Sequence, residues 1–423
     1  MLTPVSSLDS GMDDLREFAA ALVEFESTDG EEAAVSAWLA ERLDEFGFET
    51  YEWTADAGRL AEHPSFPDDP DDIDVADRPS VGGVLEFGTP DAGPTVVLNG
   101  HVDVVPADEG RWTSPPFDAR WDGDELTARG AADMKSGLAG CVFAARRLAD
   151  SDNDLDGRVV VEGVVGEEAG GVGAAAAALD NPYPFERDAV IVAEPTELSP
   201  VVACEGSVMK RLELAGRSAH AATPWRGEDV LDHFDAIRDA FEELAAEREQ
   251  RVSHPLYESF PAKWPVVCGT VEAGEWASTV PASLTAEWRI GVAPGETVAD
   301  VEAEFEAALA DVVADSEWLR EHPPTFERFS VQFEPSAVDA DEPIVRVVAD
   351  ALREHGVGDP EPRGVTYGAD ARHYVGAGIP TVVFGPGSIE QAHFPDETVD
   401  MAEVAAFVDV AAHAVADFLA QSR

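Results

Sequence analysis

Histidine and carboxylate side chains directly follow several short apolar runs of this 423-residue chain. Because the carboxyl ends of strands in an open α/β sheet share one edge, we expect these side chains to converge there. Two histidines with several carboxylates and no thiolate are the ligands that two divalent ions such as zinc, cobalt or manganese require. The residues are His101 and Asp103 after TVVLNG, Glu167 and Glu168 after VVVEGVVG, Glu194 after AVIVA, His393 shortly after TVVFGPG, and Asp133 in the turn ARGAADMKSG.

Each of these residues also has an ordinary explanation. His101 and Asp103 could form a structural hydrogen-bonded pair, and adjacent glutamates in so acidic a chain could lie in a solvated loop. Glu194 could begin a turn before Pro195, and His393 could be a plain loop histidine. The functional interpretation is favoured because all of these positions fall at strand ends within one predicted domain.

Alternating apolar runs and helical patterns predict the scaffold that carries these residues. Apolar residues repeat at helical spacing in two stretches before residue 47, and later strands alternate with helices in a βαβ rhythm, which predicts an α/β domain with a mostly parallel sheet flanked by helices. The predicted elements are strands at 95–98, 159–165, 189–193 and 381–384, and helices at 137–149, 173–179 and 343–355.

The pattern changes after about residue 207. Strands at 209–215, 266–271 and 284–292 and helices at 229–250 and 298–314 predict a smaller α+β domain, with two helices on an antiparallel sheet. We therefore expect a catalytic domain made of residues 1–207 and 339–423, interrupted by a lid domain at residues 208–338.

Acidic residues strongly outnumber basic ones, with 85 Asp and Glu against 28 Lys and Arg, for a formal net charge of −57. Such a field repels nucleic acid and anionic membrane surfaces, which excludes both as partners. The acidic residues are evenly spread and only three residues are lysines, a composition that resembles proteins of extreme halophiles. Concentrated salt screens the self-repulsion there, since the Debye length is only about 3 Å at 1 M.

The three cysteines, Cys141, Cys204 and Cys268, lack metal-site spacing and predict free thiols in a reducing compartment. The first residues show no basic start followed by an apolar run, so no signal peptide is expected. No stretch reaches the roughly eighteen apolar residues of a membrane helix. These observations predict a cytoplasmic protein.

Six motifs, in this order, resemble the signatures of the M20 metallopeptidase family: HVDVVP, RGAADMKSG, GEEAGG, AEPT, GRSAH and GPGSIEQAHFPDE. The resemblance runs from about residue 13 to the C-terminus. Within the family, the sequence is most similar to the acetylornithine deacetylase and succinyl-diaminopimelate desuccinylase branch. The Pro- and Asp-rich composition of residues 59–79 predicts an exposed excursion. This stretch departs from the compact connection usual in the family, which leaves the close substrate assignment open.

The resemblance implies roles for the strand-end residues. Asp133 would bridge two metal ions, with His101 and Glu194 completing one site and Glu168 and His393 the other. Asp103 would orient the ring of His101. Glu167 would be the general base, which moves a proton from the attacking water to the leaving nitrogen. In this family the peptide bond after the bridging aspartate is typically cis, so Asp133–Met134 is expected to be cis.

The resemblance also implies substrate-binding residues. His220 of GRSAH resembles a lid histidine that donates to the developing oxyanion and that comes from the partner chain in dimeric members, so a homodimer through the lid domain is expected. Arg289 resembles a lid arginine that grips the substrate carboxylate with its planar fork. Arg372 and Gly387 are further candidates, although Arg372 could equally form an ion pair with one of the many acids.

The sequence therefore predicts a hydrolase that cleaves the amide bond of a small N-acyl amino acid with two divalent metal ions, for which zinc is expected and cobalt or manganese would also serve. A carboxypeptidase or dipeptidase acting on short peptides would use the same metals and base. A non-catalytic metal- or ligand-binding relative is disfavoured by Glu167, because a pure binding protein has no use for a base beside its ligands. No G-x-S-x-G motif indicates a serine nucleophile, and Cys141 lies in an apolar helical pattern.

Overall fold

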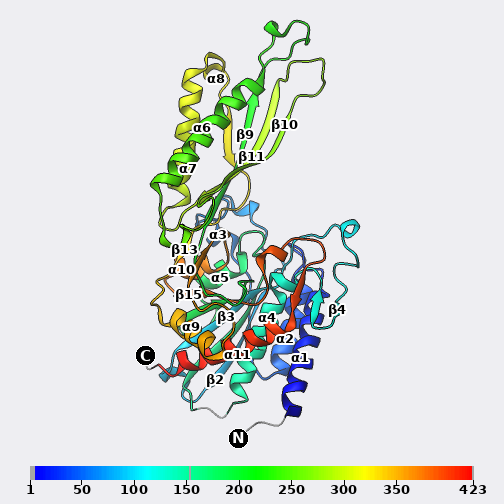
Figure 1. Ribbon diagram of the computed structural model, residues 1–423, viewed down its shortest axis with the longest axis vertical. Coiled ribbons are helices and arrows are strands. Elements are labelled where there is room, and N and C mark those ends of the chain that lie inside the picture. The colour runs from blue at the N-terminus through cyan, green and yellow to red at the C-terminus, as the bar shows by residue number, and fades with distance from the viewer. Residues whose placement is uncertain (1–4, 152–153, 422–423) are drawn as a thin grey trace. The chain divides into compact units, whose positions relative to one another are not determined.

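The computed structural model describes residues 5–151 and 154–421, and the chain divides into two compact units. The first unit contains residues 1–202, 338–363 and 369–423, and the second contains residues 203–337 and 364–368. No sequence pattern indicated that residues 364–368 belong to the second unit. Figure 1 shows the elements of both units, coloured along the chain.

The first unit is built on a mixed sheet in the order β1-β2-β6-β3-β7-β15-β8. The four strands β6, β3, β7 and β15 are parallel to one another, whereas β1, β2 and β8 join antiparallel. The predicted α/β class is confirmed, with the parallel pairs in the centre of the sheet. The strands are β1 (Glu49–Trp53), β2 (Ser80–Phe87), β3 (Thr95–His101), β6 (Gly157–Val164), β7 (Ala189–Val192), β8 (Val201–Cys204) and β15 (Thr381–Val383).

Helices cover both faces of this sheet because its central strands are apolar on both sides. Every residue of β3 and β6 is buried. Gly100 faces Leu138 of α4, whereas its neighbour Asn99 points to the opposite face and donates to Tyr374 of α10. The helices are α1 (Val5–Val23), α2 (Ala33–Glu45), α3 (Ala57–Leu60), α4 (Ser136–Ala149), α5 (Val172–Leu179), α9 (Pro343–His355), α10 (Ala371–Gly376) and α11 (Met401–Leu419).

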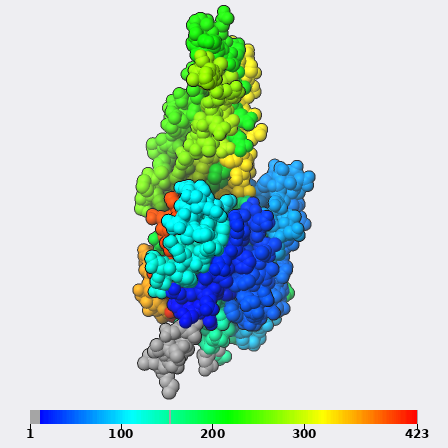
Figure 2. Space-filling model, turned by 90° about the vertical axis from the view of Figure 1, so that its right-hand side faces the viewer, coloured from blue at the N-terminus to red at the C-terminus, as the bar shows by residue number. Residues whose placement is uncertain are grey.

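A small antiparallel sheet in the order β16-β5-β4 lies beside α1 in the first unit. Arg16 of α1 donates to Asp124 in the turn between β4 (Arg120–Asp122) and β5 (Glu125–Thr127) at 2.6 Å, and its guanidinium lies over the ring of Trp121. Figure 2 shows the blue N-terminal segments and this cyan segment side by side on one face. The third strand, β16 (Thr398–Asp400), places the segment after residue 393 next to residues 125–127.

The second unit is an antiparallel sheet in the order β10-β11-β9-β12, with α6 and α7 packed against each other and against its strands. This confirms the predicted α+β architecture. The elements are β9 (Gly206–Ala215), β10 (Val266–Ala273), β11 (Ser283–Val292), β12 (Thr325–Arg328), β13 (Ser336–Ala337), α6 (Val230–Arg251), α7 (Val298–Asp315) and α8 (Glu317–Glu321). The strand β14 (Arg363–Val365) pairs with β8.

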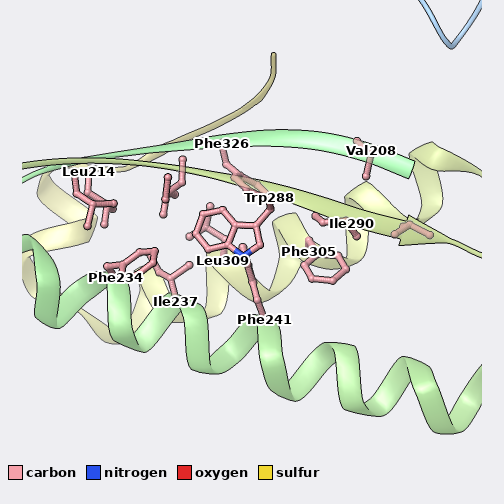
Figure 3. Packing of buried hydrophobic residues seen from close by; sticks show 14 of the residues in the cluster. Val208, Leu214, Phe234, Ile237, Phe241, Trp288, Ile290, Phe305, Leu309 and Phe326 are labelled. Atoms are coloured by element: carbon pink, nitrogen blue, oxygen red, sulfur yellow. The ribbon is translucent and has the colours of Figure 1, made fainter. Parts of the chain in front are cut away.

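The core of the second unit is rich in aromatic rings. Trp288 of β11 points toward α6, from which Phe241 points back to meet it (Figure 3), with ring centroids 5.4 Å apart. Phe241 also contacts Phe305 of α7 and Phe326 of β12 at 5.2 and 5.3 Å. Such edge-to-face and tilted contacts add to the free energy of apolar burial, so this cluster joins both helices to the sheet.

Candidate metal centre

Two groups of potential metal ligands lie in the first unit and share one residue. One ligand atom from each of His101, Asp133 and Glu194 lies within 4.8 Å of the others, and the same holds for Asp133, Glu168 and His393. Asp133 therefore belongs to both groups. All five residues are those that the sequence predicted as ligands.

Strand ends place these side chains together. His101 is the last residue of β3, Glu194 lies two residues after β7, and Glu168 lies four residues after β6. His393 lies beyond β15, and its Nε2 is 3.3 Å from Asp133 Oδ2 and 3.1 Å from Glu168 Oε2. Because β6, β3, β7 and β15 are adjacent parallel strands, residues nearly 300 positions apart meet at one edge.

Asp133 sits in an irregular turn just before α4. The Asp133–Met134 peptide bond is cis, as expected from the sequence. The carboxylate of Glu397 accepts the backbone N–H groups of Gly130, Ala132 and Asp133 at 2.8–3.0 Å, and Arg129 Nη1 at 2.8 Å. Glu397 is fully buried. It fixes the backbone that presents Asp133.

Asp103 connects His101 to the turn that carries both glutamates. Its carboxylate oxygens accept the backbone N–H groups of Glu167 at 3.2 Å and of Glu168 at 3.0 Å. The ring of His101 lies closer to the backbone of Asp103: its Nδ1 is 2.9 Å from the carbonyl oxygen and 3.7 Å from the nearer carboxylate oxygen. The Nε2 of His101 is thereby turned toward Asp133 Oδ1, at 3.3 Å.

The ionisation of the cluster is dominated by burial and by like charges. Burial, with the negative charges of Asp370 and Glu194, raises the pKa of Glu167 well above its usual range. Burial also raises the pKa of Glu194, against the opposing charge of His101. Buried carboxylates that repel one another are stabilised by nearby positive charge, and a pair of divalent ions would supply that charge.

The two imidazoles and Asp133 instead have pKa values shifted in favour of their charged forms, because they face partners of opposite charge. Hydrogen bonds to Asp133 and Glu168 raise the pKa of His393 to about 10. Burial alone would lower the pKa of His101, but its hydrogen bond to Asp133 and the charge of Asp103 raise it. Burial alone would raise the pKa of Asp133, but hydrogen bonds to the two histidines lower it. The donor set of five carboxylate and imidazole groups fits two hard-to-borderline divalent ions.

Of the other predicted site residues in the first unit, Arg372 and Gly387 take part in backbone contacts. Arg372 is buried, and its guanidinium donates to the carbonyl oxygens of Gly170 at 2.7 Å and of Ala369 at 3.1 Å. Gly387 has a φ of +87°, which favours glycine, and its carbonyl accepts the N–H of Glu197 at 2.8 Å.

His220 and Arg289 belong to the second unit. His220 is exposed in the loop after β9, where its Nδ1 accepts the N–H of Ala222 at 3.0 Å. The guanidinium of Arg289, on β11, donates to Glu205 Oε1 and to the carbonyl of Thr366, both at 3.1 Å. Burial raises the pKa of Glu205 to about 7, although Arg289 acts in the opposite direction. The side chain of Arg289 is 29% exposed.

Two carboxylates of the site were not singled out from the sequence. Glu397 lies four residues after His393 within the motif GPGSIEQAHFPDE, and Asp370 lies two residues before Arg372 in GADARH. Asp370 is almost fully buried, and neither of its carboxylate oxygens has a hydrogen-bond partner among the described residues. Burial raises the pKa of Asp370 to about 7. The only sequence signal for these two carboxylates was that each lies within four residues of a predicted site residue.

The sequence matches the family model described as peptidase family M20/M25/M40 over residues 97–417. It is 30% identical over 314 residues to an acetylornithine deacetylase of Proteus mirabilis, covering 73% of this chain and 75% of the relative. It is also 26% identical over 350 residues to a probable succinyl-diaminopimelate desuccinylase of Staphylococcus aureus, covering 77% of this chain and 83% of the relative.

The fold is shared with solved structures at low sequence identity. A tripeptidase of Staphylococcus aureus superposes with a TM-score of 0.72 at 17% identity, over 97% of this chain and 99% of that protein. In residues 5–151 and 154–421, none of the helices combines the length and apolar character that crossing a membrane requires.

Proposed function

The chain belongs to peptidase family M20/M25/M40, and we propose that it is a two-metal hydrolase that cleaves the amide bond of a small N-acyl amino acid. The observation that carries the proposal is the pair of ligand groups joined at Asp133. An acetylornithine deacetylase and a probable succinyl-diaminopimelate desuccinylase among the relatives support a deacylase.

In this proposal His101, Asp133 and Glu194 hold one ion, and Asp133, Glu168 and His393 hold the other. Zinc is the proposed native metal, with cobalt and manganese as substitutes, because imidazole and carboxylate ligands suit all three. Bound there, two divalent ions would lower the pKa of water toward about 7 and polarise the substrate carbonyl.

Glu167 acts as the general base in this scheme. Glu167 lies three residues after the end of β6, is buried, and its backbone N–H donates to the carboxylate of Asp103 at 3.2 Å. Burial raises its pKa, which makes the carboxylate a stronger base than a solvated glutamate. Glu167 would accept a proton from the attacking water and deliver it to the leaving nitrogen.

Arg289 is proposed to bind the α-carboxylate of the substrate. Its guanidinium is partly exposed and is held on one side by Glu205 and by the carbonyl of Thr366. A planar fork anchored in this way loses little side-chain entropy when it binds a carboxylate.

His220, exposed on the same unit, is proposed to donate to the developing oxyanion.

We further propose a homodimer formed through the second unit, in which His220 serves the site of the partner subunit. The edge strand β10 supports this, since the side chains of Val267 and Val271 are exposed on it and Trp276 lies exposed just beyond its end. An unpaired edge strand with apolar side chains is a ready surface for association.

Refolding a mixture of inactive Glu167→Ala and His220→Ala chains tests the exchange of His220 between subunits. Random pairing makes half of the dimers mixed, so roughly a quarter of all sites should recover if the interface is a symmetric twofold. No recovery would show that His220 acts within its own chain.

The composition supports a cytoplasmic protein of a salt-rich habitat, with nucleic acid and membranes excluded as partners by its charge of −57. A carboxypeptidase or dipeptidase is the alternative activity, since peptidases such as the tripeptidase of Staphylococcus aureus share the fold.

A hydrolysis screen in concentrated salt with zinc or cobalt tests the function. N-acetylornithine, N-succinyl-diaminopimelate, other N-acyl amino acids and dipeptides are compared by kcat/KM. We expect an N-acyl amino acid to be the best substrate. A clear preference for dipeptides would replace the deacylase with the peptidase.

A further inference from the structure

The Pro- and Asp-rich segment, residues 59–79, is ordered and has an inner face. Its acidic residues point to solvent, and its local turns include a 3-10 turn at Pro70–Asp72 that begins with the side chain of Asp69 accepting the N–H of Asp71. Leu60, Phe66 and Arg78 are nevertheless buried, with 1%, 5% and 3% of their surface exposed. The segment therefore packs against the first unit and is not a solvated excursion.

The inner face of the segment contacts the ring of His373, on α10. Phe66 stacks on this ring with centroids 6.0 Å apart and planes within 17°, and His63 lies 5.4 Å away from it. His63 and Phe66 also contact each other edge to face at 5.7 Å. The rings of His63 and Phe66 thus fix the orientation of the His373 imidazole.

His373 in turn contacts the turn that carries the two glutamates of the site. Its Nε2 lies 3.2 Å from the carbonyl oxygen of Gly170, which also accepts Nη2 of Arg372 at 2.7 Å. Burial, with the charge of Arg372, lowers the pKa of His373 well below its usual range. The imidazole is therefore neutral, and its Nε2–H donates to Gly170. A Cβ on Gly171 would come within 2.2 Å of Asp370 Oδ1. The residue that precedes α10 therefore packs closely against this end of the turn.

The other end of the segment reaches the beginning of the same turn. The guanidinium of Arg78 is held by Glu32, with Nε donating at 3.1 Å, and by Asp29. A Cβ on Gly166 would come within 2.7 Å of Arg78 Nη2. The Gly166–Gly171 turn is thus flanked at its start by Arg78 directly and at its end by His63 and Phe66 through His373.

We propose that the segment 59–79 is a positioning element for the Gly166–Gly171 turn, and that Phe66 and His373 are positioning residues for Glu167 and Glu168. The proposal rests on the roles of those glutamates in the proposed hydrolase. Hydrogen bonds hold the turn at two places. The carboxylate of Asp103 accepts the backbone N–H groups of Glu167 and Glu168, and His373 donates to the carbonyl oxygen of Gly170. Both contacts are needed, because a displacement of about 1 Å in a catalytic group costs roughly a hundredfold in rate.

Hydrogen exchange on the purified full-length chain tests the positioning without any assay of activity. The amides of Gly170 and Gly171 donate to Glu167 at 3.0 Å and to Gly166 at 2.6 Å, so they report opening of the turn. Phe66→Ala and His373→Ala should each speed their exchange about tenfold, as expected for the loss of one buried contact.

Leu60→Ala is the matched control. It truncates a buried apolar side chain of the same segment, but at a different hollow that it lines with Trp53 and Leu179. It should leave exchange of Gly170 and Gly171 unchanged. Wild-type exchange in Phe66→Ala and His373→Ala, or equal acceleration in Leu60→Ala, would overturn the proposal. If Phe66→Ala does not fold, Phe66→Leu gives the same comparison with a smaller loss of volume.

Kinetics of the zinc-loaded protein test the consequence for catalysis. Phe66→Ala should lower kcat by roughly 10- to 100-fold with little change in KM, the range seen when groups that support a metal site are removed. His373→Gln, whose amide can still donate to Gly170, should recover most of the activity that His373→Ala loses. Equal losses in both His373 variants would overturn the donor role. If the wild-type protein hydrolyses no substrate, the proposed function fails, whereas the exchange comparison still decides the positioning.

Discussion

Buried charge is arranged differently in the cluster around Asp133, in the first unit, and in the second unit. In the second unit, buried cations are paired with carboxylates: Arg248 donates to Glu296 at 2.8 Å and Lys210 to Glu302 at 2.6 Å. In the first unit, carboxylates gather beside one another, and the charges of Asp370 and Glu194 help to raise the pKa of Glu167. Paired charges are compatible with a structural role, whereas a buried excess of one sign costs free energy that protonation or bound cations can recover.

The candidate metal ligands thus lie in the first unit, whereas the second unit has an apolar core with paired buried charges. The aromatic cluster around Phe241 and Trp288 stabilises the second unit by ordinary apolar burial. Near Asp133, by contrast, burial and like charges raise the pKa values of Glu167 and Glu194, so these carboxylates oppose folding when they are ionised. Substitutions in the two clusters should therefore separate activity from stability.

The largest expected effect is on turnover, from Glu167→Ala. Loss of a general base should lower kcat by roughly 10²- to 10⁴-fold while leaving the metal content unchanged. Glu168→Ala is the matched neighbour and should lose one of two ions, because it removes a ligand. Elemental analysis of both variants checks the distinction, and equal metal loss in the two would show that the roles are wrongly assigned.

Phe241→Ala, in the second unit, should lower stability and leave metal binding unchanged. This change removes a ring that contacts Trp288, Phe305 and Phe326, and should lower the free energy of unfolding by about 3–5 kcal/mol. Trp225, which is 76% exposed, is the control, and Trp225→Ala should stay within about 0.5 kcal/mol. Urea unfolding monitored in both variants measures the difference, and metal bound per folded chain should not change. Comparable losses for the two substitutions would contradict the account of this core.

A smaller effect is expected from Arg289→Met. Loss of a charge-assisted pair of about 1.5–3 kcal/mol should reduce kcat/KM by one to two decades for substrates with a free α-carboxylate. Amides of the same substrates should be affected far less. If ester or amide analogues suffer equally, Arg289 serves the fold through Glu205 and not the substrate.

The last prediction concerns the dependence of stability on salt, to which each single surface charge contributes little. With 85 acidic residues against 28 basic ones, stability should fall as salt is removed and repulsion is no longer screened. Thermal unfolding across a series of salt concentrations gives the Tm at each. A Tm independent of salt would contradict the interpretation of the composition as an adaptation to salt.

Much of the fold could be predicted, because its strands are apolar runs followed directly by polar residues. The runs before His101, Glu167 and Glu194 are β3, β6 and β7, and the helix predicted near 137–149 is α4. The two helices on an antiparallel sheet in the second unit followed from periodicity alone. Local patterns were sufficient because each of these elements buries its own apolar stripe.

Long-range contacts of polar residues could not be predicted in the same way. Glu397 is one of 85 acidic residues, and nothing in its neighbourhood shows that it accepts the amides of residues 130–133. The composition of residues 59–79 indicated exposure, whereas Phe66 and Arg78 face inward. The contacts that decide both cases join segments separated by more than forty residues, which no local pattern encodes.

The central claim is that two ions shared at Asp133 make the site active. It is tested most directly by stripping the protein of metal with a chelator and titrating zinc back while following hydrolysis of the best N-acyl amino acid. The account predicts no turnover without metal, and activity that rises until two ions are bound per chain. Full turnover in the metal-free protein would contradict it.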